Sequence, residues 1–119
     1  MKAALYRRYG DADVVEYADI ARPVPGTGEV LVKVAGTSFN PVDSGIRGGY
    51  LTEAFPISLP HVPGIDVAGT VAEVGDDVTE WKVGDAVVGL LPMTAPGAAA
   101  EYVIAPADVL APAPTTGVL

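Results

Sequence analysis

Residues 29–39 read EVLVKVAGTSF, and the prediction of the fold starts from this stretch. β-Branched residues dominate it, and the turn sequence PGTG at 25–28 precedes it directly. Branched side chains pack well on a pleated surface, whereas proline and glycine interrupt regular structure, so this is the clearest strand of the chain. Where it ends, residues 40–48, NPVDSGIRG, bring several polar groups together.

Short strands are expected on both sides of this stretch. Residues 65–74 read IDVAGTVAEV, a strand in which Gly69 indicates a bulge or the close approach of another backbone. The other predicted strands cover residues 2–6, 14–20, 86–91 and 101–104. Only residues 41–47 favour a helical turn, which Gly48 and Gly49 would end. The sequence therefore predicts an all-β, barrel-like domain with short helical turns.

The composition excludes several classes of function. The 119-residue chain carries a formal net charge of −8, whereas nucleic-acid binding requires clustered Lys and Arg. The same charge disfavours an anionic membrane surface, and no apolar run approaches the roughly 20 residues of a membrane span. The absence of cysteine excludes disulfides and thiolate metal sites. Because the N-terminus lacks the apolar core of a signal peptide, we expect a cytoplasmic protein.

Several short motifs, taken in order, resemble the N-terminal GroES-like catalytic domain of the medium-chain dehydrogenase/reductase superfamily. The motifs are MKA at 1–3, GEVLV at 28–32, NPVD at 40–43, PGIDVAG at 63–69, VG at 74–75, VGD at 83–85 and AEYV at 100–103. The zinc-free quinone oxidoreductases are the most similar branch. The resemblance implies a partly open β-barrel over residues 1–110, in an enzyme that uses NADPH to reduce quinones or α,β-unsaturated carbonyls.

The same resemblance separates this chain from the zinc-dependent branch. That branch has a cysteine ligand where Asn40 stands, and a Gly-His-Glu triplet where residues 64–66 read GID. Isoleucine cannot bind a metal, and an amide is a poor substitute for a thiolate. Residues 91–97 are also too short for the four-cysteine structural lobe. We therefore expect neither zinc site, and we interpret His61, the only histidine, as a loop residue.

Asn40 and Tyr50 are the candidate catalytic residues. Hydride arriving at a conjugated carbon builds negative charge on the carbonyl oxygen, and without zinc this charge needs hydrogen-bond donors. The Asn40 amide and the Tyr50 hydroxyl are such donors. Pro41 keeps the Asn40 backbone extended, which would fix the direction of the amide. Alternatively, or in addition, Asn40 caps the helical turn that follows.

Asn40 and Asp43 are the candidates for contact with the cofactor. A structural interpretation of Asp43 stays open beside this one, because a carboxylate in the first turn of a helix stabilises the helix dipole. Trp81 and Tyr102 could serve as stacking platforms, but we favour a packing role for both.

The nucleotide-binding half of the superfamily is not recognisable in this chain. That half is a doubly wound sheet with a glycine-rich strand-to-helix turn for the pyrophosphate. Residues 111–119 resemble a linker, so we interpret the chain as a fragment of a longer, homodimeric enzyme and expect it to be inactive alone. An enoyl reductase domain acting on acyl thioesters, and a non-catalytic GroES-like binding module, are the alternatives.

Overall fold

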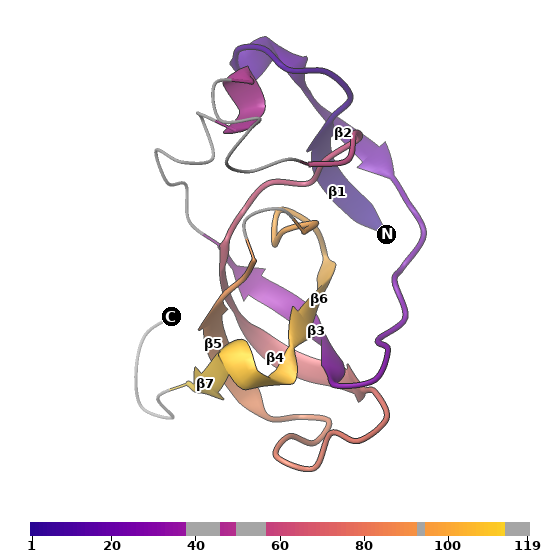
Figure 1. Cartoon of the computed structure of the whole chain (residues 1–119), viewed down its shortest axis with the longest axis vertical. Coiled ribbons are helices and arrows are strands. Elements are labelled where there is room, and N and C mark those ends of the chain that lie inside the picture. The colour runs from indigo at the N-terminus through magenta and orange to yellow at the C-terminus, as the bar shows by residue number, and fades with distance from the viewer. Residues whose placement is uncertain (38–45, 50–56, 93–94, 114–119) are drawn as a thin grey trace.

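A computed structural model of the chain consists mainly of strands (Figure 1), and it describes residues 1–37, 46–49, 57–92 and 95–113. The strands are β1 (Lys2–Tyr6), β2 (Val15–Asp19), β3 (Glu29–Gly36), β4 (Asp66–Val74), β5 (Ala86–Leu90), β6 (Tyr102–Pro106) and β7 (Leu110–Pro112). Helical geometry in these ranges is limited to two 3₁₀ turns, η1 (Ala12–Val14) and η2 (Ala107–Val109), and to residues 46–48. The all-β prediction is confirmed.

The strands form two antiparallel sheets. β1 pairs with β2, and the others form a five-stranded sheet in the order β6-β3-β4-β5-β7. Although β6 and β7 are its two edges, only the three residues of η2 join them. In a flat sheet these edges would lie about 19 Å apart, whereas the connection spans at most about 14 Å. The sheet must therefore curl, and Figure 1 shows β6 and β7 joined through the η2 turn in a partly open barrel, with no closed barrel among the strands described.

The centre of the curled sheet is apolar. Val30, Leu31 and Val32 are consecutive in β3 and fully buried, so this strand is covered on both faces. Trp81 packs against the same core, and its Nε1 donates a hydrogen bond of 2.9 Å to the carbonyl of Ala107 in η2. The predicted packing role of Trp81 is confirmed, and its indole also secures the connection between the two sheet edges.

Gly69 lies at a close backbone contact between β3 and β4. It pairs with Val34, and the register of the two strands shifts immediately beyond this pair. A Cβ on Gly69 would overlap the carbonyl oxygen of Lys33. The close backbone approach predicted from this glycine is confirmed.

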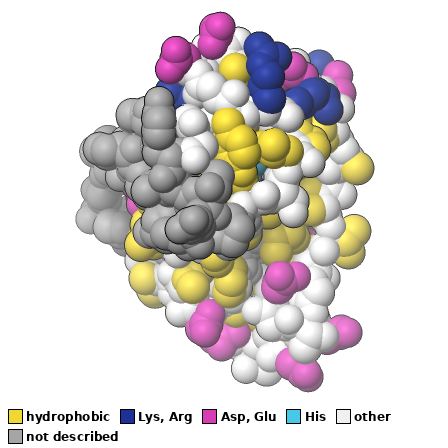
Figure 2. Space-filling view, turned by 45° about the horizontal axis from the view of Figure 1, so that its top comes forward, with side chains coloured by type: hydrophobic (Ala, Val, Ile, Leu, Met, Phe, Trp, Pro, Cys, Tyr) yellow, Lys and Arg dark blue, Asp and Glu magenta, His cyan; other side chains and the backbone are white. Residues whose placement is uncertain are grey.

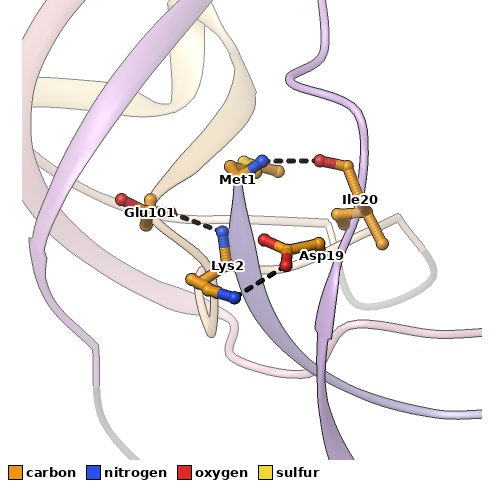
Figure 3. Close-up of polar contacts among 5 residues, drawn as sticks. All are labelled: Met1, Lys2, Asp19, Ile20 and Glu101. Carbon is orange, nitrogen blue, oxygen red and sulfur yellow. Dashed lines mark hydrogen bonds and ion pairs between the residues drawn. The ribbon is translucent and has the colours of Figure 1, made fainter.

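The N-terminal strand is tied to the rest of the molecule at several points (Figure 3). The Met1 ammonium donates to the Ile20 carbonyl at 2.7 Å, and the Lys2 amide donates to the Glu101 carboxylate. The Lys2 ammonium pairs with Asp19 at 2.7 Å. This hydrogen bond raises the pKa of Lys2 and lowers the pKa of Asp19.

Two predicted boundaries need correction. The strand predicted over 29–39 ends at Gly36, where Thr37 makes a contact described below. The domain boundary predicted at residue 110 falls inside β7, which pairs with β5, and Ala113 beyond it is buried. Pro112 can lie in β7 because an edge strand tolerates a residue without an N–H. Residues 114–119 lie outside the described part. No helix in the described ranges is long and apolar enough to span a membrane.

Candidate functional site

The candidate site is the region where β3 ends and β4 begins. The Thr37 hydroxyl donates a hydrogen bond of 2.6 Å to the carbonyl oxygen of Asp66, the first residue of β4. This bond fastens the end of one strand to the start of its neighbour. The polypeptide therefore enters residues 38–45 from a fixed point.

A second fastening, which we call the glycine clamp, joins residues 62–64 to residues 97–99. Backbone hydrogen bonds run from Gly97 to Val62 at 2.7 Å, from Ala98 to Gly64 at 2.8 Å and from Ala99 to Pro63 at 2.9 Å. Three consecutive donors facing three consecutive carbonyls hold the two segments against each other. The turn that leads into β4 is thereby positioned by a segment more than thirty residues later in the chain.

Both positions occupied by glycine in the clamp leave no room for a side chain. Gly64 has φ +103°, a conformation that L side chains rarely adopt, and a Cβ there would lie 2.9 Å from Thr37 Oγ1. A Cβ on Gly97 would collide with the carbonyl oxygens of Pro63 and Gly64. The clamp and the Thr37–Asp66 bond therefore form one tightly packed unit.

The helical residues 46–48 are anchored to the connection between β1 and β2. Ile46 is buried, and Arg47 exchanges hydrogen bonds with Gly10: its Nε donates to the Gly10 carbonyl at 3.2 Å, and its carbonyl accepts from the Gly10 amide at 2.8 Å. Gly49 ends the turn with φ +82°, and its amide donates to Ile46. The predicted end of the helical turn is confirmed.

Asn40, Asp43 and Tyr50, the residues predicted from the sequence for catalysis and cofactor contact, lie outside the described residues. The structure gives the residues on either side of them: Thr37 before residues 38–45, and Ile46 to Gly49 after them and before Tyr50. The roles of the three residues remain predictions.

The donor set for zinc is not assembled in the described part of the chain. Ile65 is a buried apolar side chain at the position where the zinc branch has histidine. His61 is buried and packs edge-on against Tyr6, with ring centroids 5.5 Å apart, and their backbones pair in both directions. It is therefore a packing residue rather than a simple loop residue. Across the described ranges, no three His, Cys, Asp or Glu residues gather in a group that could hold a metal.

Tyr102, for which we favour a packing role, lies against the guanidinium of Arg22. The Arg22 guanidinium lies 4.1 Å from the centroid of the Tyr102 ring and pairs with Glu73 at 3.0 Å, which gives Tyr102 a structural contact.

Figure 2 shows one face of the molecule, on which Lys and Arg side chains gather at the upper end together with acidic ones, while further acidic side chains lie at the lower end. Among the described residues visible on this face, the cationic side chains do not form the continuous surface that nucleic acid requires.

Sequence reasoning missed Thr37 and Gly97. The sequence pattern includes Thr37 in the predicted strand 29–39, and nothing in the local sequence identifies Asp66 as its partner. The dipeptide formed by Pro96 and Gly97 is a turn signal that could have indicated a special backbone position.

Comparison with known proteins identifies the family. Residues 26–115 match the model of the alcohol dehydrogenase GroES-like domain. A chloroplastic quinone-oxidoreductase homolog of Spinacia oleracea is 39% identical over 106 residues, covering 88% of this chain and 32% of the relative. The chain thus belongs to the GroES-like domain family of the medium-chain dehydrogenase/reductase superfamily.

Solved structures agree with this assignment. The quinone oxidoreductase from Coxiella burnetii matches with a TM-score of 0.84 and 30% identity, over 94% of this chain and 36% of that one. A mycobacterial protein solved in complex with NADPH matches with a TM-score of 0.86 and 36% identity, over 99% of this chain and 35% of that one. The chain spans about a third of the length of these relatives.

Proposed function

We propose that this chain is the substrate-side domain of an NADPH-dependent, zinc-independent oxidoreductase that reduces quinones or α,β-unsaturated carbonyls by hydride transfer. The observation that carries the proposal is the 39% identity to a quinone-oxidoreductase homolog across 88% of the chain. The similarity to a protein solved with NADPH supports the choice of cofactor.

The chemistry assigned to this chain is stabilisation of charge on the substrate oxygen. NADPH, when bound, supplies the hydride. We assign to the Asn40 amide and the Tyr50 hydroxyl the hydrogen bonds that the oxygen would accept as it gains negative charge, and to Asn40 and Asp43 contact with the cofactor. A preorganised donor of this kind contributes about 3 kcal/mol to transition-state stabilisation.

The framework that would position Asn40 is made by the described residues on either side of the segment that contains it. Thr37 is held on the Asp66 carbonyl, and the glycine clamp holds the turn before Asp66. Ile46, at the other end of residues 38–45, is buried. Fixed residues on either side of a segment reduce the conformational entropy that the segment can lose when a substrate binds.

The proposed reaction requires no metal, and the side chains at the ligand positions of the zinc branch are poor zinc ligands. Ile65 occupies a ligand position of the zinc branch, and the chain has no cysteine. Elemental analysis of the longer protein is expected to find no stoichiometric zinc, and chelation is expected to leave turnover unchanged. Loss of turnover on chelation would contradict a zinc-independent mechanism.

The test uses the longer protein that contains this chain, purified and assayed for NADPH oxidation with benzoquinone, methyl vinyl ketone and crotonyl coenzyme A. We expect turnover with the quinone or the enone. An Asn40→Ala variant is expected to lower kcat about 100-fold, while Glu80→Gln, at an exposed turn residue, leaves it unchanged. Preference for the thioester would favour an enoyl reductase, and no turnover with any acceptor would favour a binding module. We also propose a cytoplasmic homodimer, which fractionation and sedimentation would test.

A further inference from the structure

The side chain of Tyr9 packs against the backbone of Gly49. Tyr9 lies in the connection between β1 and β2, and Gly49 ends the helical turn at 46–48, which Figure 1 shows beside this connection at the upper end of the molecule. A Cβ on Gly49 would lie 3.2 Å from Cγ of Tyr9 and 3.3 Å from its Cβ. The base of the tyrosine ring therefore occupies the space that a side chain at position 49 would need.

The conformation of Gly49 depends on what surrounds it. Its φ of +82° is one that L side chains rarely adopt, and its amide donates to the carbonyl of Ile46 at 3.1 Å. Ile46 is buried, so this end of the turn is fixed. Because glycine adopts many other conformations at little cost, the hydrogen bond and the tyrosine side chain, rather than the residue itself, select this one.

Tyr9 is held beside Gly49 through its neighbour Gly10. The Gly10 amide donates to the Arg47 carbonyl at 2.8 Å, and the Arg47 Nε donates to the Gly10 carbonyl at 3.2 Å. These two bonds join the connection between β1 and β2 to the helical turn, one residue away from Tyr9. The tyrosine side chain therefore meets Gly49 from a fixed point of the backbone.

Gly49 directly precedes Tyr50, the residue proposed above as a donor to the substrate oxygen. Consecutive Cα atoms are about 3.8 Å apart across a trans peptide, so a displacement of Gly49 is passed on to Tyr50. A donor stabilises developing charge only from the correct position, and a misplacement of about 1 Å can reduce a rate about 100-fold. A side chain that fixes Gly49 therefore bears on the proposed chemistry.

We propose that Tyr9 is a positioning residue, whose side chain holds Gly49 and thereby sets the position of the Tyr50 hydroxyl. The inference rests on the proposed function, because it acts through a donor named there. The contact is made by Cβ, Cγ and Cδ1 of Tyr9, atoms that phenylalanine also has, so the phenol oxygen of Tyr9 is not required. Tyr9 touches no reacting atom and acts only through Gly49.

The test is a double-mutant cycle in the longer protein, assayed with NADPH and whichever of benzoquinone and methyl vinyl ketone it reduces. Tyr9→Ala is expected to lower kcat at least about tenfold and to change KM less than about threefold, since the donor acts in the transition state. In a Tyr50→Phe background the same substitution should change kcat less than about twofold, because the hydroxyl that it misplaces is gone. Equal effects in the two backgrounds would overturn the proposal.

Three further variants separate positioning from other effects. Tyr9→Phe should keep kcat within about twofold of the unmodified protein, and a loss as large as that in Tyr9→Ala would mean that the phenol oxygen itself acts. Tyr17→Ala, at a tyrosine of β2 that is 84% exposed, is the matched control and should leave kcat unchanged. If Tyr9→Ala does not fold, Tyr9→Leu takes its place in the cycle, because leucine keeps an apolar side chain but replaces the flat ring with a branched Cγ.

A second measurement does not depend on turnover. The order parameter of the Tyr50 amide, from ¹⁵N relaxation of the longer protein, is expected to fall by at least about 0.2 in Tyr9→Ala and to stay unchanged in Tyr17→Ala. An order parameter that does not respond to Tyr9→Ala refutes the positioning role, whether or not the protein is active. A response without turnover of any acceptor would count against the proposed function alone.

Discussion

The hydroxyl of Thr37 donates a 2.6 Å hydrogen bond to the carbonyl of Asp66, so the chain leaves β3 attached to the first residue of β4. Three residues later in the sequence comes Asn40, the proposed donor to the substrate oxygen. The bond thus links the sheet, which is well specified by its residues, to the segment on which the proposed chemistry depends.

Replacement of Thr37 should therefore lower stability through one hydrogen bond. Thr37→Val keeps the shape of the side chain but removes the donor, at an expected cost of about 1 kcal/mol in the free energy of unfolding. Thr37→Ser keeps the donor and should cost less. Urea denaturation measures both, with Thr70→Val on the exposed face of β4 as the control. Equal stability of the valine and serine variants would show that the bond contributes nothing.

Gly69 should tolerate no side chain. A Cβ at this position overlaps the Lys33 carbonyl oxygen, and both groups belong to the backbone of paired strands, so neither can rotate away. Gly69→Ala is expected to cost about 3 kcal/mol or more. Gly36→Ala is the matched control, since Gly36 lies in the same strand pair and a Cβ there meets nothing within 4 Å. Thermal unfolding followed by circular dichroism separates the two outcomes, and comparable losses in both variants would refute the argument.

The indole of Trp81 is expected to stabilise the join between the sheet edges. Trp81→Phe retains much of the apolar contact with the core but loses the bond to the Ala107 carbonyl. The expected loss is about 1 kcal/mol, together with faster amide exchange in η2 and β7. Unchanged exchange in these two elements would mean that the indole bond does not secure the connection.

The pair of Lys2 and Asp19 should make a small, pH-dependent contribution to stability. Hydrogen bonding lowers the Asp19 pKa below its ordinary value of 3.8, so the contribution is present above this pH and is lost as the pH falls through the lowered pKa. The same bond raises the Lys2 pKa above 10.5, so the contribution persists below that pH and is lost as the pH rises through the raised pKa.

A double-mutant cycle with Lys2→Met and Asp19→Asn measures this coupling. Both side chains are largely exposed, so the coupling at neutral pH should be weak and should decrease in high salt. Coupling that grows in acid would contradict the assignment of the pKa directions.

Much of the sheet could be predicted because most of its strands have a recognisable local sequence pattern. The branched residues from Val30 to Val34 predict β3, and the glycine within 65–74 predicts the crowded contact with β3. β7 was missed because its sequence, LAP, has no strand preference of its own. Its pairing with β5 follows from the curl that η2 imposes, which is a property of the whole sheet.

The site was predicted less completely than the sheet for a similar reason. The glycine clamp consists of backbone bonds between residues 62–64 and 97–99, and backbone groups are the same in every residue type. Side-chain chemistry drew attention to Asn40, Asp43 and Tyr50, whereas the framework around them is built from glycine, alanine and one threonine hydroxyl. Such contacts emerge only once distant segments have been brought together.

The position of Met1 has a practical consequence for producing the protein. Its ammonium donates to the Ile20 carbonyl at 2.7 Å, so residues fused ahead of it would replace this charged donor with an ordinary amide. An affinity tag at the amino end would then weaken one of the bonds that hold β1 in place, and purification handles are better placed elsewhere.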